Sequence, residues 1–265
     1  MESRIADSDF GSQDGSRVTI ANSTNPAVAI FDLDGTLTRG DTFVSFLLYV
    51  LRKKPVRLSR CIGLPHKIAM SILGRMPNDD LKAAFISAIL KGVTSDEINT
   101  HATKFAEKCV QDMIKPAALA RINWHRARKH RLILASASVD LYVPLIANLL
   151  GFDETVCTRV DWLEGRLTGS LSGPNLRGTA KLDAVRETLG KEQKSEIFAY
   201  SDSHWDLPLL TFADHGVAVD PDKLLFREAR RSGIATEFWR ASLAAPAMSA
   251  SPSKAGTPDA KANVR

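Results

Sequence analysis

Short apolar runs alternate with segments of three-and-four apolar spacing along most of this chain. Runs of this length bounded by turn residues predict buried strands, and the spaced segments predict amphipathic helices. Strands that alternate with helices indicate a parallel sheet covered on both faces, so we expect a Rossmann-like, doubly wound α/β fold. The expected strands are 27–31, 132–135, 155–159, 196–200 and 216–219, and the expected helices between them are 116–129, 141–150, 179–189, 205–212 and 222–231.

The alternation is interrupted after the first strand by some 75 residues with a purely helical pattern. Apolar positions recur at helical spacing over 43–51, 56–73, 81–90 and 98–114, with breaks at Pro55, Pro77 and Gly92. We therefore expect an inserted α-helical cap over 42–115, and a catalytic core made of 27–41 and 116–240. A further alternating stretch at 162–171, rich in glycine, predicts a β-hairpin.

The two ends of the chain differ from this pattern. Residues 1–26 are rich in Ser, Asp, Asn and Gly, and 241–265 consist mainly of Ala, Ser, Pro and Lys, so we expect both to be disordered tails. The first of them lacks the features of a signal peptide. Three widely spaced cysteines without a CxxC pair suit reduced thiols in the cytoplasm, and no apolar run reaches the roughly 20 residues of a membrane span.

Chemistry-bearing side chains follow three of the expected elements. Asp32 and Asp34 end the first strand, Ser136 ends the second, and Asp202 follows the strand 196–200. Lys181 lies in the first turn of the helix 179–189. Because the carboxyl ends of parallel strands meet at one edge, where open α/β sheets bind ligands, we expect these groups to surround one pocket. Carboxylates without a cluster of His or Cys suit Mg²⁺.

This set predicts phosphoryl transfer, in which catalysis is mostly positioning and charge neutralisation. Asp32 would attack phosphorus, and Asp34 would protonate the leaving oxygen and then activate water. Ser136 would donate to a phosphoryl oxygen, and Lys181 would neutralise charge on the nucleophile and the phosphate. The remaining roles are those of Asp202 in the Mg²⁺ shell, Asp206 in orienting Lys181 or a metal-bound water, and Thr36 in supporting the loop of the nucleophile.

The motifs FDLDGTLT at 31–38, Ser136 at its strand end, Lys181 and SDSHWD at 201–206 resemble the four motifs of the haloacid dehalogenase superfamily. The helical insertion between the first two resembles the subgroup with phosphoserine-phosphatase-like caps. The resemblance implies Mg²⁺ dependence and a phosphoaspartate intermediate on Asp32. It also implies metal ligands from the carboxylates of Asp32 and Asp202 and from the backbone carbonyl of Asp34.

Several departures concern the substrate. Ala137 and Ser138 stand where phosphoserine phosphatases have two glycines, and Trp205 replaces an asparagine of the fourth motif. Segments 41–51 and 200–210 are instead similar to the phosphatidylglycerophosphatase C group. We therefore expect substrate contacts from Ala137, Ser138, His204 and Trp205, although the last two could equally pack on the cap. Asp41 is either a helix N-cap or an acidic ligand for a substrate amine.

The charge pattern of the expected cap bears on which partners the protein could bind. Residues 42–78 contain seven Lys and Arg and no acidic side chain, interleaved with apolar residues. This pattern allows amphipathic helices that lie on an anionic membrane, and it equally allows ordinary solvated cap helices. The net charge of +5 does not indicate nucleic-acid binding, because no stacking platform or reading motif accompanies it.

These observations predict a Mg²⁺-dependent phosphomonoester hydrolase with a lipid phosphate such as phosphatidylglycerophosphate as the favoured substrate. Its expected location is the cytoplasm, with a peripheral position on the inner face of the membrane as the alternative. One alternative is a soluble phosphatase of small metabolites such as phosphoserine or histidinol phosphate. Others are transfer of the phosphoryl group to an alcohol, and a non-catalytic binding protein on the same fold. The oligomeric state is left open by the sequence.

Overall fold

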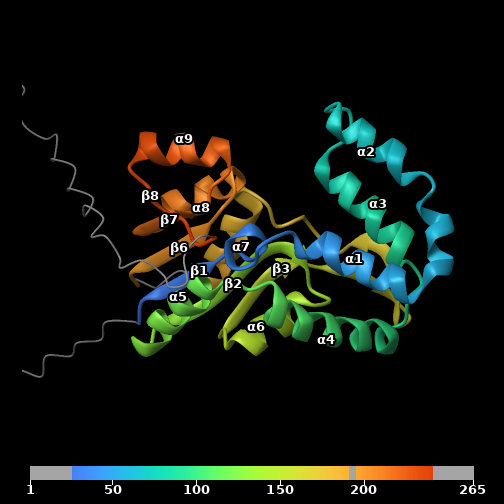
Figure 1. The fold of residues 1–265 in the computed structure, drawn as a ribbon, viewed down its shortest axis with the longest axis horizontal. Helices are drawn as coiled ribbons and strands as arrows, with labels where there is room; N and C mark the ends of the chain where they lie inside the picture. The colour runs from blue at the N-terminus through green and yellow to red at the C-terminus, as the bar shows by residue number, and fades with distance from the viewer. Residues whose placement is uncertain (1–25, 191–194, 241–265) are drawn as a thin grey trace, which may run out of the picture.

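The computed structural model describes residues 26–190 and 195–240, and a six-stranded parallel sheet forms its centre (Figure 1). The expected tails 1–26 and 241–265 lie outside these ranges except for Pro26. The strands follow the order β3-β2-β1-β6-β7-β8. Their bounds are β1 (Val28–Phe31), β2 (Arg131–Val139), β3 (Glu154–Thr158), β6 (Ile197–Ser201), β7 (His215–Val219) and β8 (Ala235–Glu237). The expected Rossmann-like fold is thereby confirmed.

Helices cover both faces of the sheet because alternate residues of each strand point to opposite sides. Ala29 and Phe31 of β1 pack with α5 (Pro116–Ala127) and α6 (Val143–Leu150). Val28 and Ile30 of the same strand pack on the other face. The helices there are α7 (Thr179–Leu189), α8 (Leu207–Phe212) and α9 (Lys223–Ser232). With both faces covered, the carboxyl edge of the sheet is the part of the core left for a ligand.

Between β1 and α5 the chain forms the helical cap, which lies beside the sheet in Figure 1. It consists of α1 (Thr42–Lys53), the 3₁₀ segment η2 (Pro55–Cys61), α2 (Leu64–Ile72), α3 (Asn78–Leu90) and α4 (Ser95–Asp112). Asp41 and Thr94 accept hydrogen bonds from backbone N–H groups in the first turns of α1 and α4, respectively. These N-caps set where the two helices begin.

The hairpin of β4 (Val160–Leu163) and β5 (Arg166–Leu171) confirms the expected one, but it belongs spatially with the cap. Gly92 N–H donates to the Leu167 carbonyl at 2.7 Å, and Leu167 N–H donates to the Val93 carbonyl at 3.0 Å. Gly169 has φ +89°, and a Cβ there would lie 2.9 Å from the Ser87 backbone of α3. The expected core segment 116–240 therefore sends one hairpin across to the inserted helices.

Three elements differ from the expected ones. The single helix expected over 56–73 is wrong: η2 and α2 are separate, because Gly63 and Pro65 follow η2 and Pro65 suits only the first turn of a new helix. β2 runs on to Val139 instead of ending at Ala135. The three residues of β8 were not expected, because their pairing with β7 is set at a distance and not by a local apolar run.

Two connections join the cap to the core, and they pair with each other. Arg39 N–H donates to the Met113 carbonyl at 2.9 Å, and Lys115 N–H donates to the Leu37 carbonyl at 2.9 Å. Thr38 and Ile114 form the antiparallel bridge between them. Because both crossings are held at one place, the cap is attached to the core directly beside the end of β1.

No helix in the described part of the chain is long and apolar enough to cross a bilayer.

A buried aromatic cluster supports the ends of the two central strands. Phe31 of β1 stacks on Tyr200 of β6 with ring centroids 4.5 Å apart. The Tyr200 hydroxyl lies 2.9 Å from Nε2 of His125, whose Nδ1 lies 2.9 Å from Nδ1 of His130. Burial, with smaller effects from nearby cations, lowers the pKa of the fully buried His125 to about 3. This imidazole is therefore neutral in the folded protein.

We predict that His125 makes stability depend on pH. Below its ordinary pKa of 6.5 the unfolded chain binds a proton on His125 and the folded chain does not. Stability is therefore fully present above pH 6.5 and is lost as pH falls toward the folded value, by about 2 kcal/mol between pH 6.5 and pH 5. Urea unfolding at both pH values should show this loss in the wild type and a smaller loss in His125→Gln. His66→Gln, on the exposed cap, is the control and should show the same loss as the wild type. Equal losses in wild type and His125→Gln would contradict the assignment.

Candidate functional site

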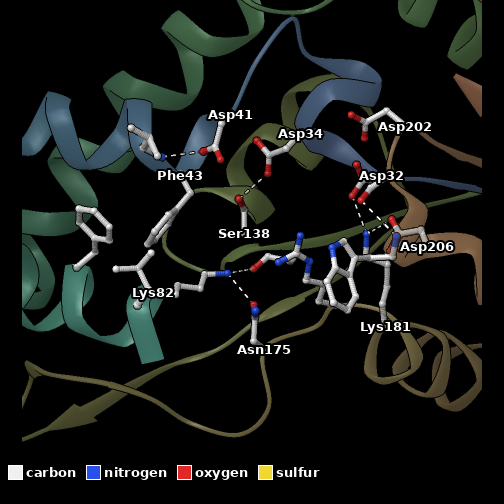
Figure 2. Close-up of a pocket in the computed structure, with 17 residues that line it drawn as sticks. Asp32, Asp34, Asp41, Phe43, Lys82, Ser138, Asn175, Lys181, Asp202 and Asp206 are labelled. Carbon is white, nitrogen blue, oxygen red and sulfur yellow. Dashed lines mark hydrogen bonds and ion pairs between the residues drawn. The ribbon is translucent and has the colours of Figure 1, made fainter. Parts of the chain in front are cut away.

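Asp32 follows β1 directly, and the side chain of Lys181 from α7 lies next to it, together with Asp206, on one side of the cavity (Figure 2). Lys181 Nζ lies 2.7 Å from Asp32 Oδ1 and 2.5 Å from Asp206 Oδ2. All three residues are buried, and Ser201 Oγ donates to the same oxygen of Asp206 at 2.8 Å. The two carboxylates raise the pKa of Lys181 against the opposing effect of burial, so the ammonium stays charged beside Asp32.

Thr36 joins Asp32 to the loop after β6. Its hydroxyl lies 3.1 Å from Asp32 Oδ2 and 3.2 Å from Asp202 Oδ1, and it accepts a hydrogen bond from the Asp202 N–H at 2.9 Å. Thr36 is part of the tight turn η1 (Leu33–Leu37), in which Gly35 has φ +77°. A Cβ on Gly35 would lie 2.0 Å from Asp202 Oδ2. Glycine therefore lets the Asp202 carboxylate approach the turn that carries Asp32.

The carboxylates of this pocket carry more negative charge than its cations balance. Burial raises the pKa of Asp32 to about 8 against the effect of Lys181, and Asp206, Asp202 and Asp34 add to the rise. Burial also raises the pKa of Asp202 to about 6, against the hydrogen bond from Thr36 and the charge of Lys115. A cation held between Asp32 and Asp202 would favour the ionised form of both.

This donor set fits Mg²⁺. The two carboxylates offer hard oxygen ligands, and the ion commonly keeps several waters instead of filling an all-protein cage. Within the described ranges, no three His, Cys, Asp or Glu side chains converge closely enough to hold a metal. The resemblance implies a further ligand in the backbone carbonyl of Asp34, whose side chain is engaged by Thr42 and Ser138.

Asp34 lines the same cavity from η1. Its Oδ1 accepts from the Thr42 N–H at 2.5 Å and the Thr42 hydroxyl at 2.6 Å, and its Oδ2 accepts from the Ser138 hydroxyl at 2.6 Å. The buried Tyr142 hydroxyl lies 3.0 Å from the Thr42 hydroxyl and extends this network. Burial and then the charge of Asp41 raise the pKa of Asp34, against these hydrogen bonds. A carboxyl of raised pKa suits a proton donor near neutral pH.

The structure separates the expected contacts of β2. Ala137 and Ser138 line the cavity, while Ser136 is fully buried and is not among the lining residues. Ser136 Oγ accepts a hydrogen bond from the Ser138 N–H at 3.0 Å. In this arrangement Ser136 shapes the irregular end of β2 that presents Ser138. Its expected donation to a phosphoryl oxygen stays a prediction, since its side chain is not among those that line the cavity.

Of the two residues of the fourth motif that we expect to contact the substrate, only one lines the cavity. Trp205 lines the cavity, but His204 does not. Asp222 Oδ2 lies 2.7 Å from His204 Nδ1 and accepts from the His204 N–H at 2.9 Å, which directs the imidazole toward the start of α9. Asp41 is the N-cap of α1, because its Oδ1 accepts from the Val44 N–H at 2.8 Å, and it also lines the cavity, so its role as a ligand for a substrate amine stays a prediction.

Three polar residues of the cavity lie outside all of the expected motifs: Lys82 of α3, and Asn175 and Arg177 of the loop before α7. Lys82 Nζ donates to the Ala137 carbonyl and, at 2.8 Å, to Asn175 Oδ1. Burial lowers its pKa to about 8, against the charges of Asp34, Asp41 and Asp79. The Arg177 guanidinium lies 4.4 Å from the centre of the Trp205 ring. The loop position just before the Lys181 helix could have indicated Asn175 and Arg177; no local pattern could have indicated Lys82.

Lys115 is a further residue that the sequence did not indicate. It follows the second cap connection, its side chain is 1% exposed, and Nζ donates to the Gly35 carbonyl and, at 2.8 Å, to Asp220 Oδ2. Its charge also lowers the pKa of Asp202. Lys115 therefore connects the turn of Asp32 to the residue after β7, next to the place where the cap is attached.

The approach of Asp202 to Gly35 gives a direct prediction. Gly35→Ala should introduce strain of about 1–3 kcal/mol, because the residue has positive φ and its Cβ would collide with the Asp202 carboxylate. We expect urea unfolding to show this loss of stability and phosphate release from p-nitrophenyl phosphate to fall at least tenfold. Gly40→Ala, with nothing within 4 Å of its Cβ, is the matched control. Equal activity of the two variants would contradict the geometry.

Several curated proteins are similar to this chain over most of its length. Protein CicA of Caulobacter vibrioides is 33% identical over 190 residues, which cover 71% of this chain and 84% of CicA. Phosphoserine phosphatase SerB1 of Mycobacterium tuberculosis is 27% identical over 78% of this chain and 69% of its own. A histidinol-phosphatase of Neisseria meningitidis is 24% identical over 78% of this chain and 96% of its own.

Among solved structures, a protein of unknown function from Bordetella pertussis has the same fold, with a TM-score of 0.69 and 21% sequence identity over 81% of this chain and 99% of that one. The family model of haloacid dehalogenase-like hydrolases matches residues 29–211, a range that contains Asp32, Asp34, Lys181, Asp202 and Asp206. Since this match spans more than half of the chain, the protein belongs to the haloacid dehalogenase-like hydrolase family.

Proposed function

We propose that this protein is a Mg²⁺-dependent phosphatase that hydrolyses a small, soluble phosphate monoester through an aspartyl-phosphate on Asp32. The observation that carries the proposal is the environment of Asp32. Its carboxylate contacts the Lys181 ammonium on one side and the Thr36 hydroxyl on the other, and the same hydroxyl contacts Asp202. Such a site offers a nucleophile, a fixed cation and a pair of oxygen ligands around one phosphoryl group.

The residues present divide the reaction between them. A carboxylate oxygen of Asp32 attacks phosphorus, the bond from phosphorus to the ester oxygen breaks, and Asp34 gives that oxygen a proton. Asp34 then takes a proton from the water that attacks phosphorus, which releases phosphate and restores Asp32. Lys181 holds the attacking carboxylate in place, oriented in turn by Asp206. Bound between Asp32 and Asp202, Mg²⁺ would neutralise charge on the phosphoryl oxygens.

The rest of the cavity favours a small polar ester over a lipid phosphate. The cavity holds about 450 Å³ and is lined by the acidic Asp41 and the basic Lys82 and Arg177, together with Phe43 and Trp205. Groups of both signs suit a leaving group that carries charges of its own. The similarity to SerB1 and to the histidinol-phosphatase supports the same choice, since the names of both describe phosphatases of small amine-bearing esters.

Phosphatidylglycerophosphate is a second candidate substrate, and one observation favours it. Large apolar side chains are exposed on the cap, including Val56, Ile62 and Ile72. An enzyme that hydrolyses a lipid has to contact the bilayer, and exposed apolar side chains suit such a contact. Turnover of phosphatidylglycerophosphate in vesicles, compared with that of soluble phosphoserine and histidinol phosphate under the same conditions, separates the two candidates. Faster turnover of the lipid would overturn the choice of a small ester.

Asp32→Asn should abolish phosphate release from every ester in the presence of Mg²⁺, because the amide is not a nucleophile for phosphorus. The folded state should be retained, since the amide has nearly the same shape and burial penalises the charge it replaces. Phosphate release and far-ultraviolet circular dichroism measure the two effects. Asp183→Asn, on the exposed side of α7, is the matched control and should keep full activity. Activity in Asp32→Asn would refute the nucleophile.

The role proposed for Asp41 has a separate test. Asp41→Asn keeps an oxygen that can cap α1 but removes the charge that would bind a substrate amine. We expect KM for phosphoserine or histidinol phosphate to rise about tenfold, which corresponds to the loss of one charge-assisted hydrogen bond. Hydrolysis of the amine-free p-nitrophenyl phosphate should be unchanged. An equal effect on all three esters would assign Asp41 to the structure of the cap alone.

A further inference from the structure

The part of the cap around η2 and α2 exposes large apolar side chains to water. We define the cap apex as residues 52–75, which include the end of α1, η2, α2 and the turn after it. Between 63% and 81% of the surface of each of five large apolar residues is exposed there. They are Val56, Leu58, Ile62, Ile72 and Leu73. No residue of η2 is buried, and α2 buries only Leu64.

Polar contacts attach the cap apex firmly to the rest of the cap. Arg57 Nη1 donates to the Ile89 and Lys91 carbonyls at 2.9 Å each, and Arg60 Nη1 donates to the Lys91 carbonyl at 3.3 Å. Lys54 forms an ion pair with Glu97 of α4 at 3.1 Å. These contacts attach the cap apex to the end of α3 and to α4 through polar side chains, while the five large apolar side chains remain exposed to water.

Four further basic residues of the cap apex are exposed, namely Arg52, Lys53, Lys67 and Arg75. Within the part of the chain that the structure describes, none of the four has an ion-pair partner. The sequence offers none locally either, because 42–78 contains no Asp or Glu. The cap apex thus combines exposed apolar groups with uncompensated positive charge.

We propose that the cap apex docks on an anionic lipid surface. Apolar side chains next to lysines and arginines suit the boundary between acyl chains and negatively charged head groups. A second copy of this chain is the poorer occupant, because two such faces would bring their positive charges together. The apex lies away from the sheet and from α9, so a flat surface can reach it (Figure 1).

Docking at this place uses none of the residues that line the cavity. The cap contributes Asp41, Phe43, Val44, Leu81, Lys82 and Phe85 to the cavity, and all of them lie outside 52–75. The proposal therefore holds for a soluble ester as well as for a lipid phosphate. It would place the enzyme at the membrane without deciding what it hydrolyses.

The test is co-sedimentation of the full-length protein with vesicles. The wild type should bind vesicles of phosphatidylglycerol mixed with phosphatidylcholine, and high salt should weaken the binding; vesicles of phosphatidylcholine alone should bind it at least tenfold more weakly. Ile62→Ser/Ile72→Ser and Lys67→Glu/Arg75→Glu should each lower binding to the anionic vesicles about tenfold or more. Phosphate release from p-nitrophenyl phosphate, unchanged in both, shows that the variants are folded.

Matched controls place the same changes outside the cap apex. Lys223→Glu/Arg230→Glu on α9 removes the same charge, and Leu163→Ser/Phe238→Ser removes comparable exposed apolar surface. Both should bind like the wild type. Equal binding of the wild type to the two kinds of vesicle, no binding to either, or equal losses in apex and control variants would overturn the proposal. It would also fail if sedimentation velocity showed a dimer that Ile62→Ser/Ile72→Ser dissociates, since the apex would then join two copies.

Discussion

The ammonium of Lys181, held between the buried carboxylates of Asp32 and Asp206, is the interaction on which the site depends. A carboxylate as buried as Asp32 would be protonated at neutral pH without nearby positive charge, and a protonated carboxyl does not attack phosphorus. Lys181, which lies 149 residues after Asp32 in the chain, supplies part of that charge. Removal of Lys181 would leave the carboxylates of Asp32 and Asp206 buried without this cation, whereas Lys181 keeps Asp206 as a partner when Asp32 is neutralised, so the ammonium is a requirement of the fold as well as of the chemistry.

The turn after β1 shows how the fold meets this requirement. Within five residues it places Asp32 at the strand end, brings Gly35 against Asp202, and directs the Thr36 hydroxyl at two carboxylates. Lys115 contacts the same turn by donating to the Gly35 carbonyl. Since Lys115 directly follows the paired connections of the cap, the attachment of the cap and the position of the nucleophile share one set of contacts.

Much of the core could be predicted from the sequence, because its information is local. The apolar run before Asp32 and the first turn that holds Lys181 each mark a strand or helix end, and in a parallel sheet such ends meet at one edge. Side-chain direction was not predictable. Ser136 turns inward and Ser138 faces Asp34, because β2 continues past the point where its apolar run ends. Lys82 and Lys115 reach the site through the placement of the cap, which no periodicity in the sequence encodes.

The central claim is that Asp32 itself carries the phosphoryl group between the two halves of the reaction. Acid quench during turnover, followed by reduction with borohydride, converts an aspartyl-phosphate to homoserine, which mass spectrometry of peptides locates in the sequence. The chemistry described above predicts homoserine at position 32 and at no other aspartate, and only when substrate and Mg²⁺ are both present. Homoserine at position 34, or none at any position while phosphate is being released, would contradict it.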